Sequence, residues 1–228
     1  SIEHPRAWDP RVADLAAYVE SARGLEFDHP VLVDFLTAAE YTHETTSEQD
    51  ALDNEDRAGL DRQAASLRAI GVASGDVDLF AAFNSVADGG TLAFYEPVEQ
   101  VIRVRGTTMT VGLQVTLVHE LTHALQDQHF DLERLYEDDL DSSAATAFRA
   151  LIEGDALRVE EAYTTEELSS EEQTAYDEEY ASALETSADS TVDVPPFISA
   201  SFSVPYLLGQ PFVMMLADLG NGAVDDAF

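Results

Sequence analysis

One stretch of the chain, residues 115–130, limits most strongly what the protein can fold into and do. It reads VTLVHELTHALQDQHF, and neither Pro nor Gly interrupts the sequence from Leu113 to Asp131. Apolar residues recur at every fourth position, as they do along one side of a helix: Leu113, Leu117, Leu121 and Leu125. The sequence therefore predicts one long helix that carries the pattern H-E-x-x-H.

Two histidines of this helix are spaced to bind one metal ion. His119 and His123 are four residues apart, so both imidazoles lie on the same face of the helix. Glu120 follows His119 after about 100° of helical rotation. Its carboxylate is therefore expected beside the metal rather than on it, where it can take a proton from metal-bound water.

The net charge of the chain is far from zero. The 228 residues include 45 Asp and Glu against 11 basic residues, all of them Arg, for a net charge of −34. This excess argues against a nucleic-acid partner, whose phosphates would be repelled. A binding surface for cations or basic partners would concentrate the acids in one block, whereas these are spread along the chain and are densest at 136–141 and 165–180. We favour adaptation of the whole surface to high salt, as in a protein from a halophile, since molar salt shortens the Debye length to about 3 Å.

The composition also limits the ligands and the cellular location. The chain has no Cys, which excludes disulfides and thiolate metal ligands. No apolar run approaches the ~20 residues of a membrane span, so no span is expected. The chain opens with SIEHPRAWDP, without Met and without a visible signal peptide. An extracellular or cell-surface location is expected if a targeting segment has been removed, and otherwise the cytoplasm at high salt.

The remaining sequence predicts a single α+β domain, 1–228, that is mostly helical. A short buried strand is expected at 30–36, and two strands at 91–95 and 100–106 form a β-hairpin, a small antiparallel sheet beside the metal helix. Residues 1–90 read as a helical N-terminal part, and residues 91–228 carry the candidate site. Further helices are expected at 10–23, 47–70 (capped by Ser47), 78–86, 142–163, 169–187 and 212–219. Loop or extended chain is expected at 131–141, 189–202 and 204–206.

A catalytic zinc usually has three protein ligands and one open position, so a third ligand is needed. His129 completes the H-E-x-x-H-x5-H spacing of the metzincins, but that arrangement needs a sharp turn at a Gly where this chain has Gln126. On a continuing helix His129 lies about 15 Å along the axis from His119 and cannot share the metal. No convincing Met-turn follows; Met214 and Met215 read as core residues.

Glu153 is the preferred third ligand. It lies on the next predicted helix in the apolar run ALIEGDA, where burial of an unpaired carboxylate is costly and metal coordination would offset the cost. Gly154 costs roughly 1 kcal/mol in a helix, and a close approach of this helix to the metal helix is a reason for it. Asp155 is a weaker alternative for the same role. An ordinary acidic residue in an acidic protein is the simpler interpretation of Glu153.

These residues resemble the gluzincins, in which HExxH on one helix is joined by a Glu ligand on the next. HELTHALQDQHFDL, ALIEGDA and VPYLLGQPFV resemble a largely uncharacterised prokaryotic group of metallopeptidase-like proteins whose members continue beyond the point where this chain stops. Many gluzincins place an Asp four residues after the ligand Glu to orient the first His. Here that position is Leu157, and Asp155, Glu160 or Asp127 would have to supply the carboxylate.

The resemblance implies a zincin-like core and zinc-dependent hydrolysis of peptide bonds in a peptide or protein substrate. His119, His123 and Glu153 would bind Zn²⁺, and Glu120 would act as the general base. Tyr206 would help to stabilise the oxyanion, although a core or surface role is the simpler interpretation of that tyrosine. The strand 100–105 would pair with an extended peptide if it lies at the edge of its sheet. Its cations, Arg103 and Arg105, read as salt-bridge partners of the acidic surface rather than substrate ligands.

Two other functions remain open. The chain could be a catalytically inactive protein that keeps zinc for structural reasons, or a cell-surface interaction module that binds partners through its acidic face. Retention of Glu120 speaks against both, because a purely structural site does not need a carboxylate there.

Overall fold

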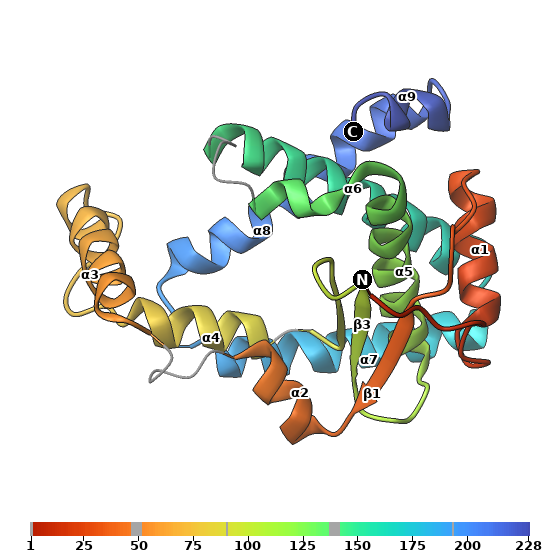
Figure 1. Ribbon diagram of the computed structural model, residues 1–228. Helices are drawn as coiled ribbons and strands as arrows, with labels where there is room; N and C mark the ends of the chain where they lie inside the picture. The colour runs from red at the N-terminus through yellow and green to blue at the C-terminus, as the bar shows by residue number, and fades with distance from the viewer. Residues whose placement is uncertain (1, 47–51, 90, 137–141, 193) are drawn as a thin grey trace.

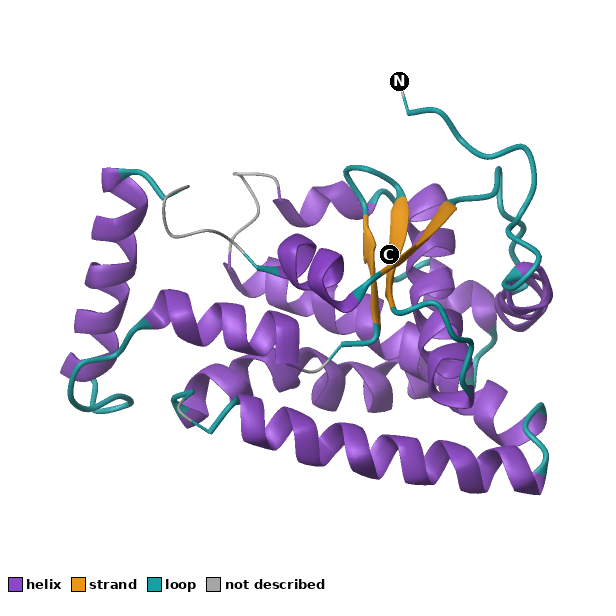
Figure 2. Cartoon of the chain, turned by 90° about the horizontal axis from the view of Figure 1, so that it is seen from below, coloured by secondary structure: helices purple, strands orange, loops and turns teal. Residues whose placement is uncertain are grey.

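A computed structural model describes residues 2–46, 52–89, 91–136, 142–192 and 194–228. The chain is mostly helical with one small sheet (Figure 2). The first half contains α1 (Ala13–Arg23), β1 (Leu32–Leu36), α2 (Ala38–Thr45), α3 (Asn54–Ala69), α4 (Leu79–Gly89), β2 (Ala93–Glu96) and β3 (Val101–Arg105). The second half contains α5 (Val111–Phe130), the 3-10 helix η2 (Leu132–Tyr136), α6 (Ser142–Glu166), α7 (Ser170–Ser190), α8 (Pro196–Ala217) and α9 (Asn221–Asp225).

Helix α5 is the predicted metal helix and lies in the middle of the fold. Figure 1 shows it between α1 on one side and the sheet on the other, and helices α6 and α7 also pack against it. The side chain of Thr110 caps its first turn, and Asp131 ends it in the left-handed conformation at φ 56°. The carboxylate of Glu179 on α7 accepts hydrogen bonds from Gly112 N and Thr110 Oγ1, at the end of the helix where a negative charge is favoured.

The sheet confirms the predicted hairpin, and the strand predicted at 30–36 joins it as β1. The strand order is β1-β3-β2, with β2 antiparallel and β1 parallel to β3, so the sheet is mixed rather than antiparallel. Strand β3 is therefore central. The prediction that residues 100–105 pair with an extended peptide is wrong, because both edges of β3 are already occupied by neighbouring strands. Arg105 forms an ion pair with Asp88, and Arg103 with Glu44 and Glu99, as the salt-bridge interpretation predicted.

The helices differ from the sequence-based expectations mainly near the C-terminus. Residues 196–217 form one continuous helix, α8, where a loop, an extended segment and a short helix were expected. Pro205 and Pro211 lie inside it and remove two backbone donors. Pro205 is buried, and α8 packs along much of α6, so tertiary packing outweighs the local signal. Met215, expected in the core, is 71% exposed, and Met214 is also exposed.

Two smaller corrections concern the N-terminal half. Residues 38–45 form α2, which begins with a capping box between Thr37 and Glu40. Helix α3 begins at a second capping box made by Asp53 and Asp56. The predicted cap Ser47 lies outside the described residues.

Helix α8 is apolar and mostly uncovered. None of its 22 residues is charged, and large apolar side chains along it are exposed: Phe202, Leu207, Leu208, Phe212, Met214 and Met215. Of the helices in the described ranges, α8 alone is long and apolar enough to cross a membrane by length and composition. One such helix is by itself weak evidence for a span; a core helix that meets the same criterion is mostly buried, whereas 17% of this apolar window is buried.

Helices α6 and α8 touch through their glycines. A Cβ added at Gly154 on α6 would overlap the backbone of Gly209 on α8, and one added at Gly209 would overlap the carbonyl of Ala150. A close approach is therefore present at Gly154, but its partner is α8 and not the metal helix α5 that the sequence predicts. This contact brings Tyr206 of α8 near Glu153 of α6.

We predict that Gly154→Ala destabilises the fold. The added methyl group forces α6 and α8 apart, which costs about 1–3 kcal/mol of unfolding free energy. The matched control is Gly59→Ala in α3, where the nearest atom to the new Cβ is Arg62 Nη2 at 3.9 Å. That change should gain up to about 1 kcal/mol from helix propensity. Denaturant unfolding in molar salt compares the two, and equal stabilisation by both would contradict a glycine-dependent contact.

Candidate metal centre

Three predicted ligands converge between α5 and α6. His119 Nε2 and His123 Nε2 lie 3.3 Å and 3.4 Å from the same oxygen, Glu153 Oε2. Each of the three residues offers one ligand atom, and these atoms lie within 4.8 Å of one another. The histidines lie one turn apart on α5, and Glu153 faces them from the first half of α6. The three side chains form a group that can hold a metal ion.

Two of the three distances between these atoms match tetrahedral coordination. Two atoms that each bind a tetrahedral ion at about 2.0–2.1 Å lie about 3.3–3.4 Å from each other. Both distances to Glu153 Oε2 have this value. The donor set, two imidazole nitrogens and one carboxylate oxygen, leaves a fourth position for water or substrate.

The three groups shift one another's protonation. Burial alone would lower the pKa of His119, but its hydrogen bonds to Glu153 and Glu160 raise it well above its ordinary value. Burial would also lower the pKa of His123, but the neighbouring carboxylate of Glu153 raises it, and the pKa lies above its ordinary value. Burial would raise the pKa of Glu153, but the two imidazoles have the larger opposite effect, and the pKa falls well below the usual range of a carboxyl group. A carboxylate held ionised among nitrogen donors suits a cation that replaces the imidazole protons.

The second nitrogen of each histidine also has a partner. His119 Nδ1 lies 2.9 Å from Glu160 Oε2, and His123 Nδ1 lies 3.0 Å from Gln126 Oε1. The sequence offered three carboxylates that could orient His119, and in the structure the one that contacts it is Glu160. It lies two helical turns after Glu153 on the same side of α6. Partners of this kind orient an imidazole and leave its Nε2 lone pair available for a metal.

Glu120 lies beside the ligands and is held by the sheet. Its Oε2 accepts a hydrogen bond of 2.8 Å from the backbone N–H of Tyr95 on β2. Burial raises the pKa of Glu120. The Tyr95 hydroxyl donates to Asp127 Oδ2 at 2.7 Å, and Asp127 Oδ1 accepts from Leu132 N. Tyr95 thus joins β2 to α5 through two hydrogen bonds. Asp127 therefore contacts the sheet and does not orient a histidine.

Tyr206 lies at the border of the site. Its ring stacks at 6.3 Å from that of His119, and the residue is 40% exposed. Removal of the hydroxyl from water and the carboxylates of Glu153 and Glu120 raise the pKa of Tyr206, so the hydroxyl keeps its proton. Tyr206, Arg149 and Glu153 line a groove of about 390 Å³ between α6 and α8. A smaller cavity of about 100 Å³, also lined by Glu153 and Arg149, is bordered by Tyr95 and His123.

The rejected ligands lie elsewhere. His129 is near the end of α5, and its Nε2 is 2.9 Å from the backbone oxygen of Glu26. Asp155 is fully buried, and it contacts Arg23, Arg158 and Gln126 rather than the histidines.

A scan against protein-family models found no match, and neither did searches of curated proteins and of solved structures. The resemblance to gluzincins therefore stays a prediction, and the functional assignment depends on the geometry of the site.

Sequence reasoning missed two contributors to this site. Gln126 was considered only as a residue that replaces a turn-forming Gly, although its i+3 spacing from His123 places the two side chains together on a helix. Tyr95 had no sequence signal, because its contact with Glu120 depends on how the hairpin docks against α5.

We predict that Glu153→Ala weakens the binding of Zn²⁺ by more than about 100-fold, since it removes a ligand rather than a supporting residue. His129→Ala should leave the affinity unchanged, because His129 faces Glu26. Competition with a chromophoric chelator measures both. The reverse order of effects would assign the third ligand to His129.

Proposed function

We propose that the protein is a zinc-dependent peptide hydrolase in which Glu120 is the general base. The observation that carries the proposal is the placement of Glu120. Its carboxylate is buried and held by Tyr95 N–H, next to His119, His123 and Glu153 but outside the metal-binding group. A purely structural metal site needs no carboxylate in that position. Two imidazoles and one carboxylate form the ligand set of many catalytic zinc sites.

The protein side chains divide the chemistry among them. A bound zinc ion supplies a Lewis acid and lowers the pKa of the water that it binds. Glu120 accepts the proton of the attacking water and returns it to the leaving amine. The raised pKa of Glu120 favours this exchange, because a general base works best when its pKa is close to the working pH. Tyr206 keeps its proton and donates a hydrogen bond to the developing oxyanion.

Strand β2 lies at the edge of the sheet, and this position favours an extended peptide as substrate. Arg105 N donates to Leu92 O. In an antiparallel pair, alternate residues point their backbone N–H and C=O groups toward the neighbouring strand, so those of Ala93 and Tyr95 point away from β3. One of these groups, Tyr95 N–H, reaches Glu120. Because Tyr95 N–H is already bonded to Glu120, an extended chain would pair with the other backbone groups of this edge and would pass beside the general base.

We predict that Glu120→Gln removes hydrolysis while zinc stays bound. Loss of a general base lowers kcat by about 10²–10⁴-fold. The amide is nearly isosteric, and Glu120 is not a ligand, so zinc content should match the parent. The control Glu171→Gln changes an exposed acid on α7 by the same chemistry and should leave activity intact. Peptide cleavage and metal analysis are measured in molar salt, which screens the charge of −34.

Two results would contradict the proposal. Zinc bound by both proteins with no cleavage by either would favour a structural metal site. A parent protein that binds no zinc would remove the basis for metal-dependent hydrolysis.

A second prediction concerns Tyr206. Tyr206→Phe removes one hydrogen-bond donor to the oxyanion and should lower kcat by about 10²–10³-fold with little change in KM. The control Tyr180→Phe alters an exposed tyrosine on α7 and should have no effect. A kcat within twofold of the parent would show that Tyr206 does not stabilise the oxyanion.

A further inference from the structure

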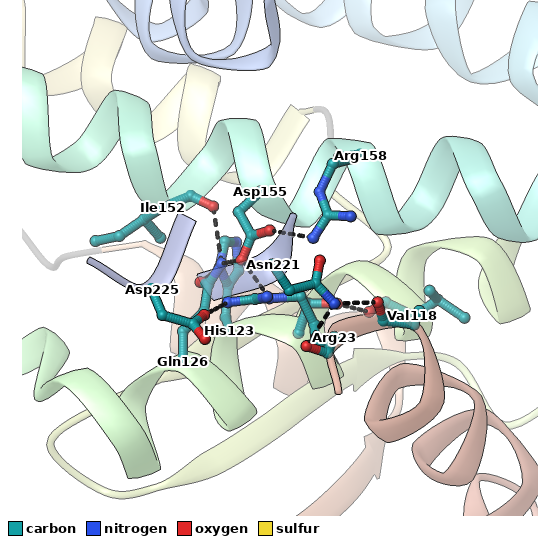
Figure 3. Close-up of polar contacts among 11 residues, drawn as sticks. Arg23, Val118, His123, Gln126, Ile152, Asp155, Arg158, Asn221 and Asp225 are labelled. Carbon is teal, nitrogen blue, oxygen red and sulfur yellow. Dashed lines mark hydrogen bonds and ion pairs between the residues drawn. The ribbon is translucent and has the colours of Figure 1, made fainter. Parts of the chain in front are cut away.

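A buried chain of polar side chains leads from His123 to the first helix, α1, and the last helix, α9. Figure 3 shows it: His123 contacts Gln126, Gln126 contacts Asp155, and Asp155 contacts Arg23, which reaches Asp225. The side chains of Arg23 and Asp155 are 0% exposed, and Gln126 is 1% exposed. These residues come from α5, α6, α1 and α9.

The contacts of Gln126 determine how its amide is oriented. Nε2 donates both of its hydrogens, to Ile152 O at 3.1 Å and to Asp155 Oδ2 at 2.9 Å. The reverse orientation would place the amide oxygen against a carbonyl and a carboxylate, two groups that only accept. Oε1 must therefore face His123 Nδ1, at 3.0 Å.

This orientation determines the tautomer of neutral His123. An amide oxygen can only accept, so Nδ1 of the imidazole must carry the hydrogen. The lone pair is then on Nε2, the nitrogen that lies 3.4 Å from Glu153 Oε2. Gln126 thus selects the form of His123 that can bind a metal.

The position of Asp155 depends on α1 and α9. Its carboxylate contacts Arg23 Nε at 2.8 Å and Arg158 Nη2 at 3.0 Å, and Arg23 Nη2 contacts Asp225 Oδ1 at 2.7 Å. Two cations and two anions balance the buried charge. Asn221 Nδ2 donates to Arg23 O at 2.8 Å and joins the start of α9 to the end of α1.

We infer that Gln126 is a positioning residue for His123, and that Asp155, Arg23 and Asp225 hold Gln126 in its working orientation. The inference depends on the proposed metal site. Through this chain α1 and α9, remote in sequence from the H-E-x-x-H motif, set the affinity of the metal centre. A chain of buried ion pairs is weak support for stability alone, since apolar side chains would fill the same space at no desolvation cost.

The test reads the tautomer and the metal affinity separately. The ¹⁵N spectrum of metal-free protein, at a pH where its histidines are neutral, should show His123 protonated at Nδ1. Gln126→Leu should turn this signal into a mixture of tautomers and weaken Zn²⁺ binding about 10–100-fold, the usual effect of losing a partner of a metal ligand. Asp225→Asn, at the more exposed end of this chain of contacts, should change the tautomer ratio of His123 and the Zn²⁺ affinity in the same direction as Gln126→Leu, by a smaller factor.

The matched control is Gln128→Leu, the same substitution on the same helix. Gln128 contacts Asp28 N and the backbone of His29, away from the metal centre, so tautomer and affinity should stay as in the parent.

Two outcomes would overturn the inference. In one, Gln126→Leu lowers the unfolding midpoint but leaves the His123 tautomer and zinc affinity unchanged, as a merely structural role requires. In the other, His123 of the parent is protonated at Nε2. Neither readout depends on peptide cleavage, so a protein that holds zinc but hydrolyses nothing would refute the proposed function and leave this inference standing.

Discussion

The structure depends on one requirement: the polar face of α5 is buried, and each of its polar side chains needs a partner. His119, Glu120, His123, Gln126 and Asp127 are all at most 9% exposed. A buried polar group without a hydrogen bond costs about 1–3 kcal/mol, and an unpaired charge costs more. The partners are Glu160 and Glu153 on α6, Tyr95 on β2 and Asp155 on α6. The polar face therefore specifies where α6 and the hairpin dock.

The same requirement separates the candidate metal ligands from the groups that support them. Glu153 is placed between two imidazoles and shares one oxygen between them. Glu120 is turned away toward a backbone N–H of the sheet, which leaves it free of the metal-binding group. Helix α8, which carries no charged residue, contributes to the site through its close packing on α6. Its glycine contact with α6 sets the distance at which Tyr206 approaches Glu153 and His119.

Sequence reasoning succeeded where the signal is local. The i, i+4 histidines and the unbroken leucine row predicted α5, and the cost of burying a carboxylate in ALIEGDA singled out Glu153, which lies beside both histidines. The reasoning was wrong where distant contacts decide the structure. Strand β3 is central because β1, some 70 residues earlier, pairs with it, and nothing within residues 100–105 encodes that pairing. Helix α8 continues through Pro205 and Pro211 because α6 packs along it, whereas local rules favour a break.

The supporting groups of the site were the least accessible to sequence reasoning. Three carboxylates were equal candidates for orienting His119, and only the packing of α6 on α5 selects Glu160. The chain from Gln126 to Asp225 runs through Arg23, and its contacts join residues up to 202 positions apart. A long-range network of this kind leaves no periodic pattern.

The central claim is that His119, His123 and Glu153 bind one zinc ion as a catalytic ligand set. X-ray absorption spectroscopy of the zinc-loaded protein in molar salt tests it most directly. We predict one zinc per chain, four-coordinate, with two imidazole nitrogens and two oxygens at about 2.0–2.2 Å. One oxygen belongs to Glu153, and its contribution should be lost in Glu153→Ala. A spectrum without imidazole scattering, or with oxygen ligands only, would show zinc held by the acidic surface and would contradict the account.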